Sequence, residues 1–354
     1  MKLFQCQSCA QLVYFENGVC ESCSHALGFL PAQTLLSALE PDGANWVALG
    51  GDPGDRYRFC ANAEFGACNW LIPEPSDETL CVACRHNLVI PDISLASNLA
   101  HWQKLERAKH RLIYSLLRWG LPLANRTDDP VHGLAFEFLA VAPDTPKVMT
   151  GHDNGLITMA LAEADDADRE RVRLEMGEAY RTLLGHFRHE VGHHYWDLLV
   201  RDGGQLDAFR ALFGDDAQDY DAALQRHYRQ GAPADWRQHF ISSYASSHPW
   251  EDFAETWAHY LHIVDTLEMG AAFGLRIGSW VADGALARPV DFDPYGPGEI
   301  QRLVDAWLPL VFAVNSLNRA MGQPDLYPFV LTPGVVRKLG FIHDLVHHRN
   351  GSRH

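Results

Sequence analysis

Apolar side chains recur every three or four positions in several stretches of the chain, the spacing that buries one face of a helix. Residues 97–118 and 300–320 follow this pattern, and each stretch is predicted to form an amphipathic helix. Residues 168–200 follow it as well, over a length that suits one long helix or two helices that meet near Gly177 or Gly185. Helices are therefore expected to dominate the larger, C-terminal part of the chain.

Two shorter apolar runs, residues 134–141 and 149–161, are typical of β-strands. The segment Gly155–Leu161 is a candidate edge strand, to which an extended peptide could add as a further strand. The alternative is an ordinary strand in the interior of a sheet. The pattern as a whole favours an α+β protein, with a mainly helical domain and a small β-sheet.

The composition is that of a folded protein, because 47% of the 354 residues are hydrophobic and 11% are aromatic. The longest apolar run, near residues 307–314, contains Pro309 and is much shorter than the roughly 20 residues of a membrane helix. The chain begins without an apolar signal segment. We therefore expect a cytoplasmic protein without a membrane partner, in which paired cysteines bind metal more often than they form disulfides.

All eight cysteines fall within the first 84 residues, in two sets of four. In the first set, two CxxC pairs flank a strand-like run, residues 12–15, which is followed by the hairpin turn signal Asn17-Gly18. Each CxxC turn presents two thiolates from one side, and two such turns complete the tetrahedral coordination of zinc. This spacing predicts a zinc ribbon with the ligands Cys6, Cys9, Cys20 and Cys23.

The second set is less regular, because its first two cysteines are separated by seven residues before a CxxC pair follows. Residues 70–72 supply a short strand between the two halves. A redox couple would need only one CxxC pair and would leave the other cysteines unexplained, and unligated thiols are the remaining alternative. We interpret the set as a second structural zinc site, with the ligands Cys60, Cys68, Cys81 and Cys84.

The charge of the chain argues against nucleic acid as a partner. The formal net charge is −16, and residues 1–90 carry four basic side chains against ten acidic ones. Each zinc bound by four thiolates adds about −2 to this segment. Such a segment gains nothing from neutralising phosphates. The ribbons are therefore predicted to be structural modules or docking sites for a protein partner, with zinc stabilising a small core.

Residues 186–196 contain the motif HExxH. His189 and His193 are four residues apart, so both imidazoles lie on one helix face and can bind one zinc ion. Glu190 projects beside that ion and can accept a proton from an attacking water. The motif also arises by chance in a chain with 19 histidines, and the alternative is a half-buried, histidine-rich helix without metal.

A stripe of polar residues follows in residues 248–262, a predicted helix that begins near Pro249. Aromatic side chains surround this stripe, so its carboxylates are expected to be buried. Buried carboxylates need partners, and a metal ion is one such partner. A metzincin would place its third histidine six residues after His193, where this chain has Leu199, so that class is excluded. The stripe consists of Glu251, Glu255, His259 and His262.

HExxH followed some tens of residues later by ExxxE resembles the zinc peptidases of the gluzincin type. The resemblance implies that Glu251 is the third zinc ligand and that Glu255 supports a ligating histidine from outside the coordination sphere. The segment Glu251-Asp252-Phe253-Ala254-Glu255 also looks like the corresponding segment of anthrax lethal factor. There a tyrosine seven residues upstream faces the zinc, which implies that Tyr244 donates to the developing oxyanion.

Over nearly its whole length the chain is similar to a bacterial family of zinc-binding metallopeptidases with an N-terminal zinc ribbon. Residues 181–190 and 250–262 carry this resemblance. The resemblance implies the order of the domains. It says less about the activity, because the family is named after its zinc-binding motif.

Together these observations predict three parts: residues 1–44 with the first zinc ribbon and a connector, 45–95 with the second ribbon, and 96–354 as a zincin-like metallopeptidase domain. One catalytic and two structural zinc ions are expected. The predicted activity is zinc-dependent hydrolysis of a peptide or amide bond in a peptide or protein substrate. The alternative is a catalytically silent, zinc-stabilised scaffold for protein interactions, which would not need Glu190 as a base.

Overall fold

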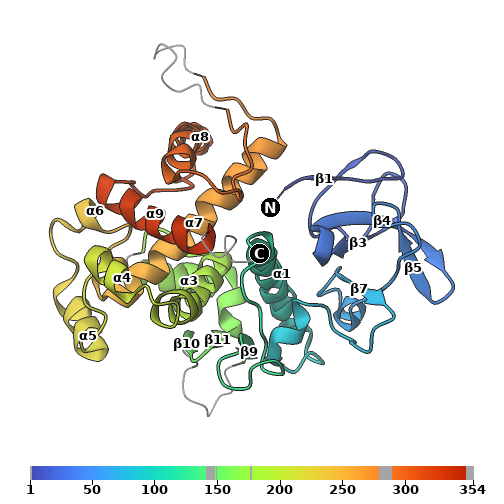
Figure 1. The fold of residues 1–354 in the computed structure, drawn as a ribbon, viewed down its shortest axis with the longest axis horizontal. Helices are drawn as coiled ribbons and strands as arrows, with labels where there is room; N and C mark the ends of the chain where they lie inside the picture. Colours follow the sequence, from blue (N-terminus) through green and yellow to red (C-terminus); the bar gives the residue numbers. More distant parts are fainter. Residues whose placement is uncertain (1, 141–147, 149, 176–177, 279–288, 348–354) are drawn as a thin grey trace. The chain divides into compact units, whose positions relative to one another are not determined.

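The computed structural model describes residues 2–140, 148, 150–175, 178–278 and 289–347. They form two compact units that divide after residue 174. The first unit contains every strand that the structure describes, and the described part of the second unit is built from helices (Figure 1). The α+β class expected from the sequence is confirmed.

The first unit begins with β1 (Phe4–Gln5) and β2 (Leu12–Val13), which pair in an antiparallel hairpin. The sequence placed a hairpin turn at Asn17-Gly18, but the turn between β1 and β2 is the first CxxC segment itself. Asn17 instead closes a local turn, in which its amide N–H donates to the Tyr14 carbonyl oxygen at 2.9 Å. The first cysteine pair therefore lies at the tip of the hairpin.

A five-stranded antiparallel sheet follows, in the order β3-β4-β5-β6-β7. The β4–β5 hairpin turns at residues 42–45, where the two ribbon segments were predicted to meet, so both cysteine sets are attached to one continuous sheet. A bridge between Phe29 and Trp70 brings the first strand of this sheet beside the last. The strands are β3 (Ala26–Leu30), β4 (Leu35–Asp42), β5 (Asn45–Ala48), β6 (Arg56–Phe59) and β7 (Leu71–Glu74), and Leu30, Leu39, Ala48, Tyr57 and Leu71 form their buried core.

A second sheet has the order β10-β11-β9-β8, formed by β8 (Asn87–Val89), β9 (Ala135–Leu139), β10 (Gly151–Asp153) and β11 (Leu156–Ala160). Both apolar runs therefore do form strands, although residues 141 and 149 lie outside the described part. The expectation that residues 155–161 form an edge strand is wrong. A tight turn at Asn154 and Gly155, both with positive φ, folds β10 back onto β11, so β11 is paired on both sides.

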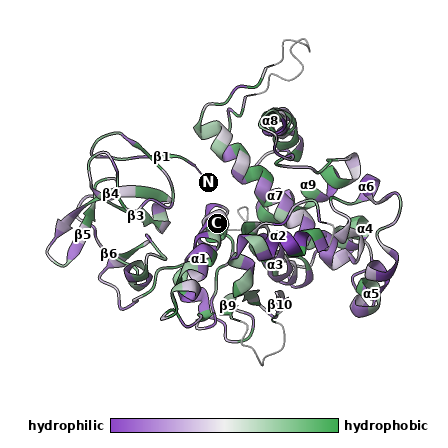
Figure 2. Ribbon diagram, turned by 180° about the vertical axis from the view of Figure 1, so that it is seen from behind, coloured by the Kyte–Doolittle hydropathy of each residue, from purple (hydrophilic) through white to green (hydrophobic). Residues whose placement is uncertain are grey.

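The helices that begin in the first unit are α1 (Ala96–Arg118) and α2 (Asp166–Glu175), and the last residue of α2 lies at the division between the units. The predicted helix over residues 97–118 is confirmed by α1. α2 buries none of its described residues, and it is coloured as hydrophilic in Figure 2. The pattern over residues 168–200 belongs to two helices, because the next helix begins only at Leu183. The Thr182 hydroxyl caps that helix by accepting the Gly185 N–H at 3.0 Å, while the alternative break at Gly177 lies outside the described residues.

The second unit is arranged around one long helix, α7, which is buried over most of its length and packs against α3, α4, α8 and α9 (Figure 1). Pro249 at the first turn of α7 and the helix at residues 300–320 agree with the sequence prediction. None of the helices in the described ranges is long and apolar enough to cross a lipid bilayer. The helices are α3 (Leu183–Tyr195), which continues as a π-helical turn over Trp196–Arg201, α4 (Leu206–Phe213), α5 (Tyr220–Gln230), α6 (Trp236–His239), α7 (Pro249–Ala272), α8 (Ile300–Ala320) and α9 (Pro333–His347).

Helices α3 and α7 approach each other closely at Gly192, which lies inside the HExxH segment. A Cβ atom added to Gly192 would lie 3.0 Å from the Cα atom of Ala254, closer than side chains normally come to a backbone. One helical turn further along, the ring of Tyr195 stacks on that of Trp257, with 5.0 Å between the ring centroids. The missing side chain thus lets the two helices pack nearly backbone to backbone.

Candidate active site and metal centres

The candidate active site is built on the facing sides of α3 and α7. His189 and His193 are one helical turn apart on α3, and their ring centroids are 5.0 Å apart. Glu251 lies in the first turn of α7, where the side chain of His248 caps the helix by accepting the Trp250 N–H. Only 1% of Glu251 is exposed. The two helices therefore bring three predicted ligands together from distant parts of the sequence.

The three side chains present donor atoms that converge on one point. The Glu251 Oε2 atom lies 3.0 Å from His189 Nε2 and 3.6 Å from His193 Nε2. Donors held at about 2.0–2.2 Å from a tetrahedral zinc ion would have similar mutual distances. Glu251 Oε2 is buried and accepts no hydrogen bond from the described residues. A cation between the three atoms would satisfy it, so this donor set fits zinc.

The electrostatics of the site favour positive charge at this point. Burial would lower the pKa of His189, but Glu251 and Glu255 raise that pKa well above its usual value. Burial would raise the pKa of Glu251, but the two histidines hold it well below its usual range. The carboxylate therefore stays ionised although it is buried, and it attracts either a proton on His189 or a metal ion.

Glu255, one helical turn after Glu251, holds His189 from the other side. His189 Nδ1 donates to Glu255 Oε1 at 2.8 Å, which leaves Nε2 directed at the metal point. The Ser242 hydroxyl donates to Glu255 Oε2 at 2.6 Å. Burial would raise the pKa of Glu255, but the hydrogen bond from His189 lowers it to about 2. This chain of contacts fixes the tautomer and the orientation of the imidazole, a recurrent arrangement around metal-binding histidines.

Glu190 and Tyr244 are the two remaining residues proposed from the sequence. Glu190 follows His189 on α3 and is 9% exposed. Tyr244 lies in the short helical turn Tyr244–Ser246, with its ring centroid 6.0 Å from that of His189. Burial and the negative charge of Glu251 raise the pKa of Tyr244, so its hydroxyl stays protonated and is available as a hydrogen-bond donor. The structure thus places Tyr244 against the ring of a predicted ligand, and Glu190 directly after that ligand in α3.

Sequence reasoning missed two residues of this site. The Tyr220 hydroxyl, at the start of α5, donates to Glu251 Oε1, the oxygen that faces away from the histidines. The ring of Trp250 lies 3.8 Å from that of His193. A tyrosine 31 residues before the ligand gave no local signal, because only the return of α5 towards α7 brings it to the site. Trp250, next to Glu251, is one of the aromatic residues around the polar stripe, and its aromatic character alone does not predict a contact with His193.

The first cysteine set forms a compact cluster of four sulfur atoms. Cys6 Sγ lies 3.6 Å from Cys23 Sγ, and Cys9 Sγ lies 3.6 Å from Cys20 Sγ. These distances are close to the edge of about 3.8 Å that a tetrahedron with Zn–S bonds of about 2.3 Å would have. Each CxxC pair is followed by a residue with φ of 63°, Ala10 or Ser24, so the two turns repeat the same geometry.

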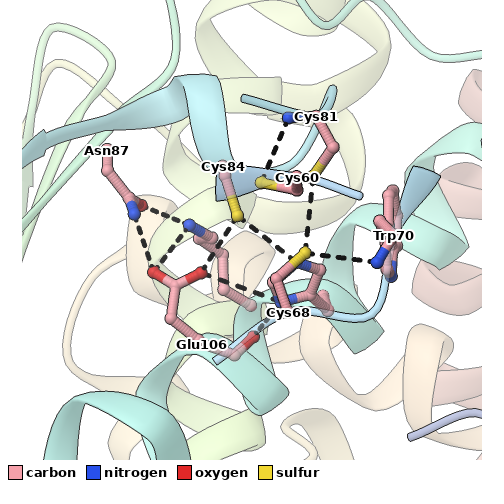
Figure 3. A network of polar contacts seen from close by, with 9 residues as sticks. Cys60, Cys68, Trp70, Cys81, Cys84, Asn87 and Glu106 are labelled. Carbon is pink, nitrogen blue, oxygen red and sulfur yellow. Dashed lines mark hydrogen bonds and ion pairs between the residues drawn. The ribbon is translucent and has the colours of Figure 1, made fainter. Parts of the chain in front are cut away.

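The second cysteine set is also clustered, with 3.8 Å between Cys68 Sγ and Cys81 Sγ. Backbone N–H groups of Trp70 and Cys81 point at the sulfur atoms of Cys68 and Cys60, at 3.3 and 3.4 Å (Figure 3). Thiolates bound to zinc accept such bonds readily, since they carry negative charge. All eight cysteines lie in the described part and none forms a disulfide. Both clusters therefore fit a zinc ion held by four thiolates.

Comparison with known proteins gives two family matches. A family model described as "Putative zinc-binding metallo-peptidase" matches residues 98–345, and one described as a zinc-ribbon domain matches residues 3–95. Uncharacterized proteins of Mycobacterium bovis and of two strains of Mycobacterium tuberculosis are 44% identical over 347 residues. These matches cover 98% of this chain and 95% of each relative. No solved structure matches.

Proposed function

The chain belongs to this family of zinc-binding metallopeptidases with a zinc-ribbon domain, and we propose that it hydrolyses peptide or amide bonds at the site between α3 and α7. The observation that carries the proposal is the convergence of His189, His193 and Glu251 on one point, and Glu190 follows the first of these ligands in α3. Two histidines and one glutamate are the protein ligands of well-known zinc hydrolases, in which the fourth position remains open. The arrangement of HExxH and a later ExxxE supports our assignment of the site to the gluzincin class.

In the proposed mechanism, each side chain has a separate task. Zinc held at the site would act as a Lewis acid and lower the pKa of a water molecule towards about 7. Glu190 accepts the proton of the attacking water and passes it to the leaving amine. Tyr244 donates its hydroxyl hydrogen to the oxyanion of the tetrahedral intermediate. Glu255 keeps His189 in the tautomer that presents Nε2 to the ion.

The two tyrosines near the metal point are expected to differ in their kinetic effects. Replacing Tyr244 with phenylalanine should lower kcat with little change in KM, because the lost hydrogen bond would form only in the transition state. A loss of about 10²-fold is expected, as for single oxyanion donors in other hydrolases. Replacing Tyr220 with phenylalanine should instead weaken zinc binding, since its hydroxyl holds Glu251. Steady-state kinetics and a zinc titration of both variants would separate these roles, and the reverse pattern would make Tyr220 the oxyanion donor.

The proposed activity can be tested without knowing the natural substrate. The full-length, zinc-loaded protein would be incubated with a diverse peptide library, and new termini would be identified by mass spectrometry. We expect cleavage that a chelator abolishes and added zinc restores. A protein that binds zinc at the site but cleaves no member of the library or of a denatured protein mixture would support the alternative, an interaction scaffold stabilised by zinc.

A further inference from the structure

The second cysteine cluster is in direct contact with helix α1, in the segment matched by the peptidase family model. His110, on α1, places its Nε2 atom 3.3 Å from Cys68 Sγ and 3.6 Å from Cys84 Sγ. Its other ring nitrogen, Nδ1, lies 2.6 Å from the backbone oxygen of Glu106. The imidazole is 4% exposed. A histidine that had no part in the sequence-based zinc sites thus faces two of the four sulfur atoms.

The partners of the ring determine how it can act. A backbone carbonyl oxygen only accepts hydrogen bonds, so His110 Nδ1 must carry a hydrogen and donate it to Glu106. Nε2 then either carries a second hydrogen, which makes the ring a cationic imidazolium that donates to the two thiolates, or offers a lone pair to the metal. The four cysteine sulfurs already lie within 4.8 Å of one another and complete a four-ligand set, the number that structural zinc sites use. The geometry therefore favours donation to the thiolates.

The charges around the cluster point in the same direction. Four thiolates around a zinc ion leave a net charge of about −2, which is unfavourable in a buried environment. The Lys109 ammonium group is also buried, but it is 2.9 Å from Glu106 Oε1, and these two charges offset each other. Asn87 donates to the same carboxylate oxygen at 2.8 Å (Figure 3). The ammonium group of Lys109 is thus occupied by the Glu106 carboxylate. The Nε2 atom of His110 instead faces the sulfur atoms of Cys68 and Cys84.

Aromatic packing fixes this histidine in place. The ring of Trp70, which lies between the two halves of the cysteine set, meets the His110 ring edge to face at 5.0 Å. One turn further along α1, the ring of Tyr114 packs against Phe15 from the first ribbon at 5.4 Å. The Lys109 ammonium group lies 5.8 Å and 5.7 Å from the rings of Phe136 and Phe138 on β9. The helix is therefore held between the ribbon segment and the second sheet.

We propose that His110 is a positioning residue of the second zinc centre: its Nε2–H group donates to the thiolates of Cys68 and Cys84, and this contact makes α1 part of the metal-binding unit. Zinc retention at this centre and the order of α1 then depend on each other. Residues outside the coordination sphere typically change metal affinity by 10–100-fold. The proposal does not depend on the hydrolytic activity, because it concerns a different metal centre.

The test uses the full-length protein with cadmium in the cysteine centres, observed by ¹¹³Cd NMR. The chemical shift distinguishes sulfur-only coordination from mixed sulfur and nitrogen coordination. We expect two sulfur-only signals in the unmodified protein, and His110→Ala should move only one of them. Metal release to a competing chelator should become about 10–100-fold faster from that centre. His110→Gln, which keeps an N–H donor, should restore part of the difference.

His101→Ala is the matched control, since His101 lies on the same helix and approaches Asp165 at 3.9 Å. It should leave both signals and both release rates unchanged. Hydrogen exchange of residues 96–118 should rise in His110→Ala, and in the unmodified protein after metal loss from the second centre. Unchanged signals and release rates in a folded His110→Ala variant would overturn the proposal. A mixed sulfur and nitrogen signal in the unmodified protein that His110→Ala abolishes would also overturn it, because His110 would then be a ligand.

Discussion

Replacing Glu190 with glutamine is expected to reduce peptide hydrolysis by about 10²–10⁴-fold while the zinc content stays unchanged. Glutamine has nearly the same shape as glutamate, so the packing of α3 against α7 is preserved. It cannot accept a proton from water at neutral pH, and the attacking water then loses its base. The histidine and glutamate donors are not altered by this change. The loss should therefore appear in kcat and not in metal binding.

The same preparation would be used for steady-state kinetics and for the zinc content, which is measured by elemental mass spectrometry. Asp197→Asn is a suitable control, because Asp197 lies two turns further along the same helical segment and pairs with Arg201 at 2.6 Å. It removes an equal charge at a distance from the metal point and should leave turnover unchanged. If Glu190→Gln cleaved peptides as fast as the unmodified protein, the assigned mechanism would be wrong.

Replacing Glu251 with alanine is expected to remove one zinc ion per chain and to abolish activity. Two imidazoles alone form an incomplete set for zinc, which in catalytic sites has three protein ligands. The two cysteine centres do not depend on Glu251, so they serve as an internal reference. We expect three zinc ions in the unmodified protein and two in Glu251→Ala. Retention of three ions would show that another residue supplies the third ligand.

The Glu255→Gln variant tests whether Glu255 is itself a zinc ligand or only supports the ligand His189. Glutamine at position 255 can still accept a hydrogen bond from His189, but without the charge that stabilises the imidazole. The variant should therefore keep three zinc ions at saturating metal, with about 10–100-fold weaker binding at the active site. If this variant lost zinc as completely as Glu251→Ala, Glu255 would have to be counted among the ligands.

The parts of the molecule that could be predicted from the sequence are those determined by short spacings. The two CxxC pairs and the HExxH motif depend on positions a few residues apart, so a local turn or a single helix is enough to place the donors. The start of α7 at Pro249 and the extent of α1 followed from local signals for the same reason. The convergence of Glu251 with the histidines agrees with the resemblance to known zinc peptidases.

The parts that could not be predicted depend on how distant segments return to each other. Tyr220 reaches Glu251 only because α5 folds back towards the start of α7. The segment Gly155–Leu161 has the apolar pattern of an edge strand and of an interior strand alike, and the turn at Asn154 decided between them. His110 gave no metal signal, since it is 26 residues from its nearest cysteine in the sequence.

The boundary between the two family matches, residues 95–98, is crossed by several contacts within the first unit. Strand β8 precedes the boundary and pairs with β9, which follows it. His86 Nδ1 donates to the backbone oxygen of Leu134 across the same boundary at 2.8 Å. A fragment that begins at residue 96 would leave β9 without these partners and α1 without the contacts of His110 with Cys68 and Cys84. Experiments on the active site are therefore best made on the full-length chain.

The close approach of α3 and α7 at Gly192 has a consequence for how the zinc ligands can vary. His189 and His193 belong to one helix and Glu251 to the other, so the distance between the helix axes sets the size of the donor triangle. Metal–ligand distances tolerate changes of only about 0.2 Å. A methyl group at position 192 would lie 3.0 Å from the Cα atom of Ala254, so the two helices would be expected to move apart and the donor triangle to widen. The smallest residue in the motif thus sets the separation of the two helices. The distances between the zinc ligands therefore depend on a position that contributes no donor atom.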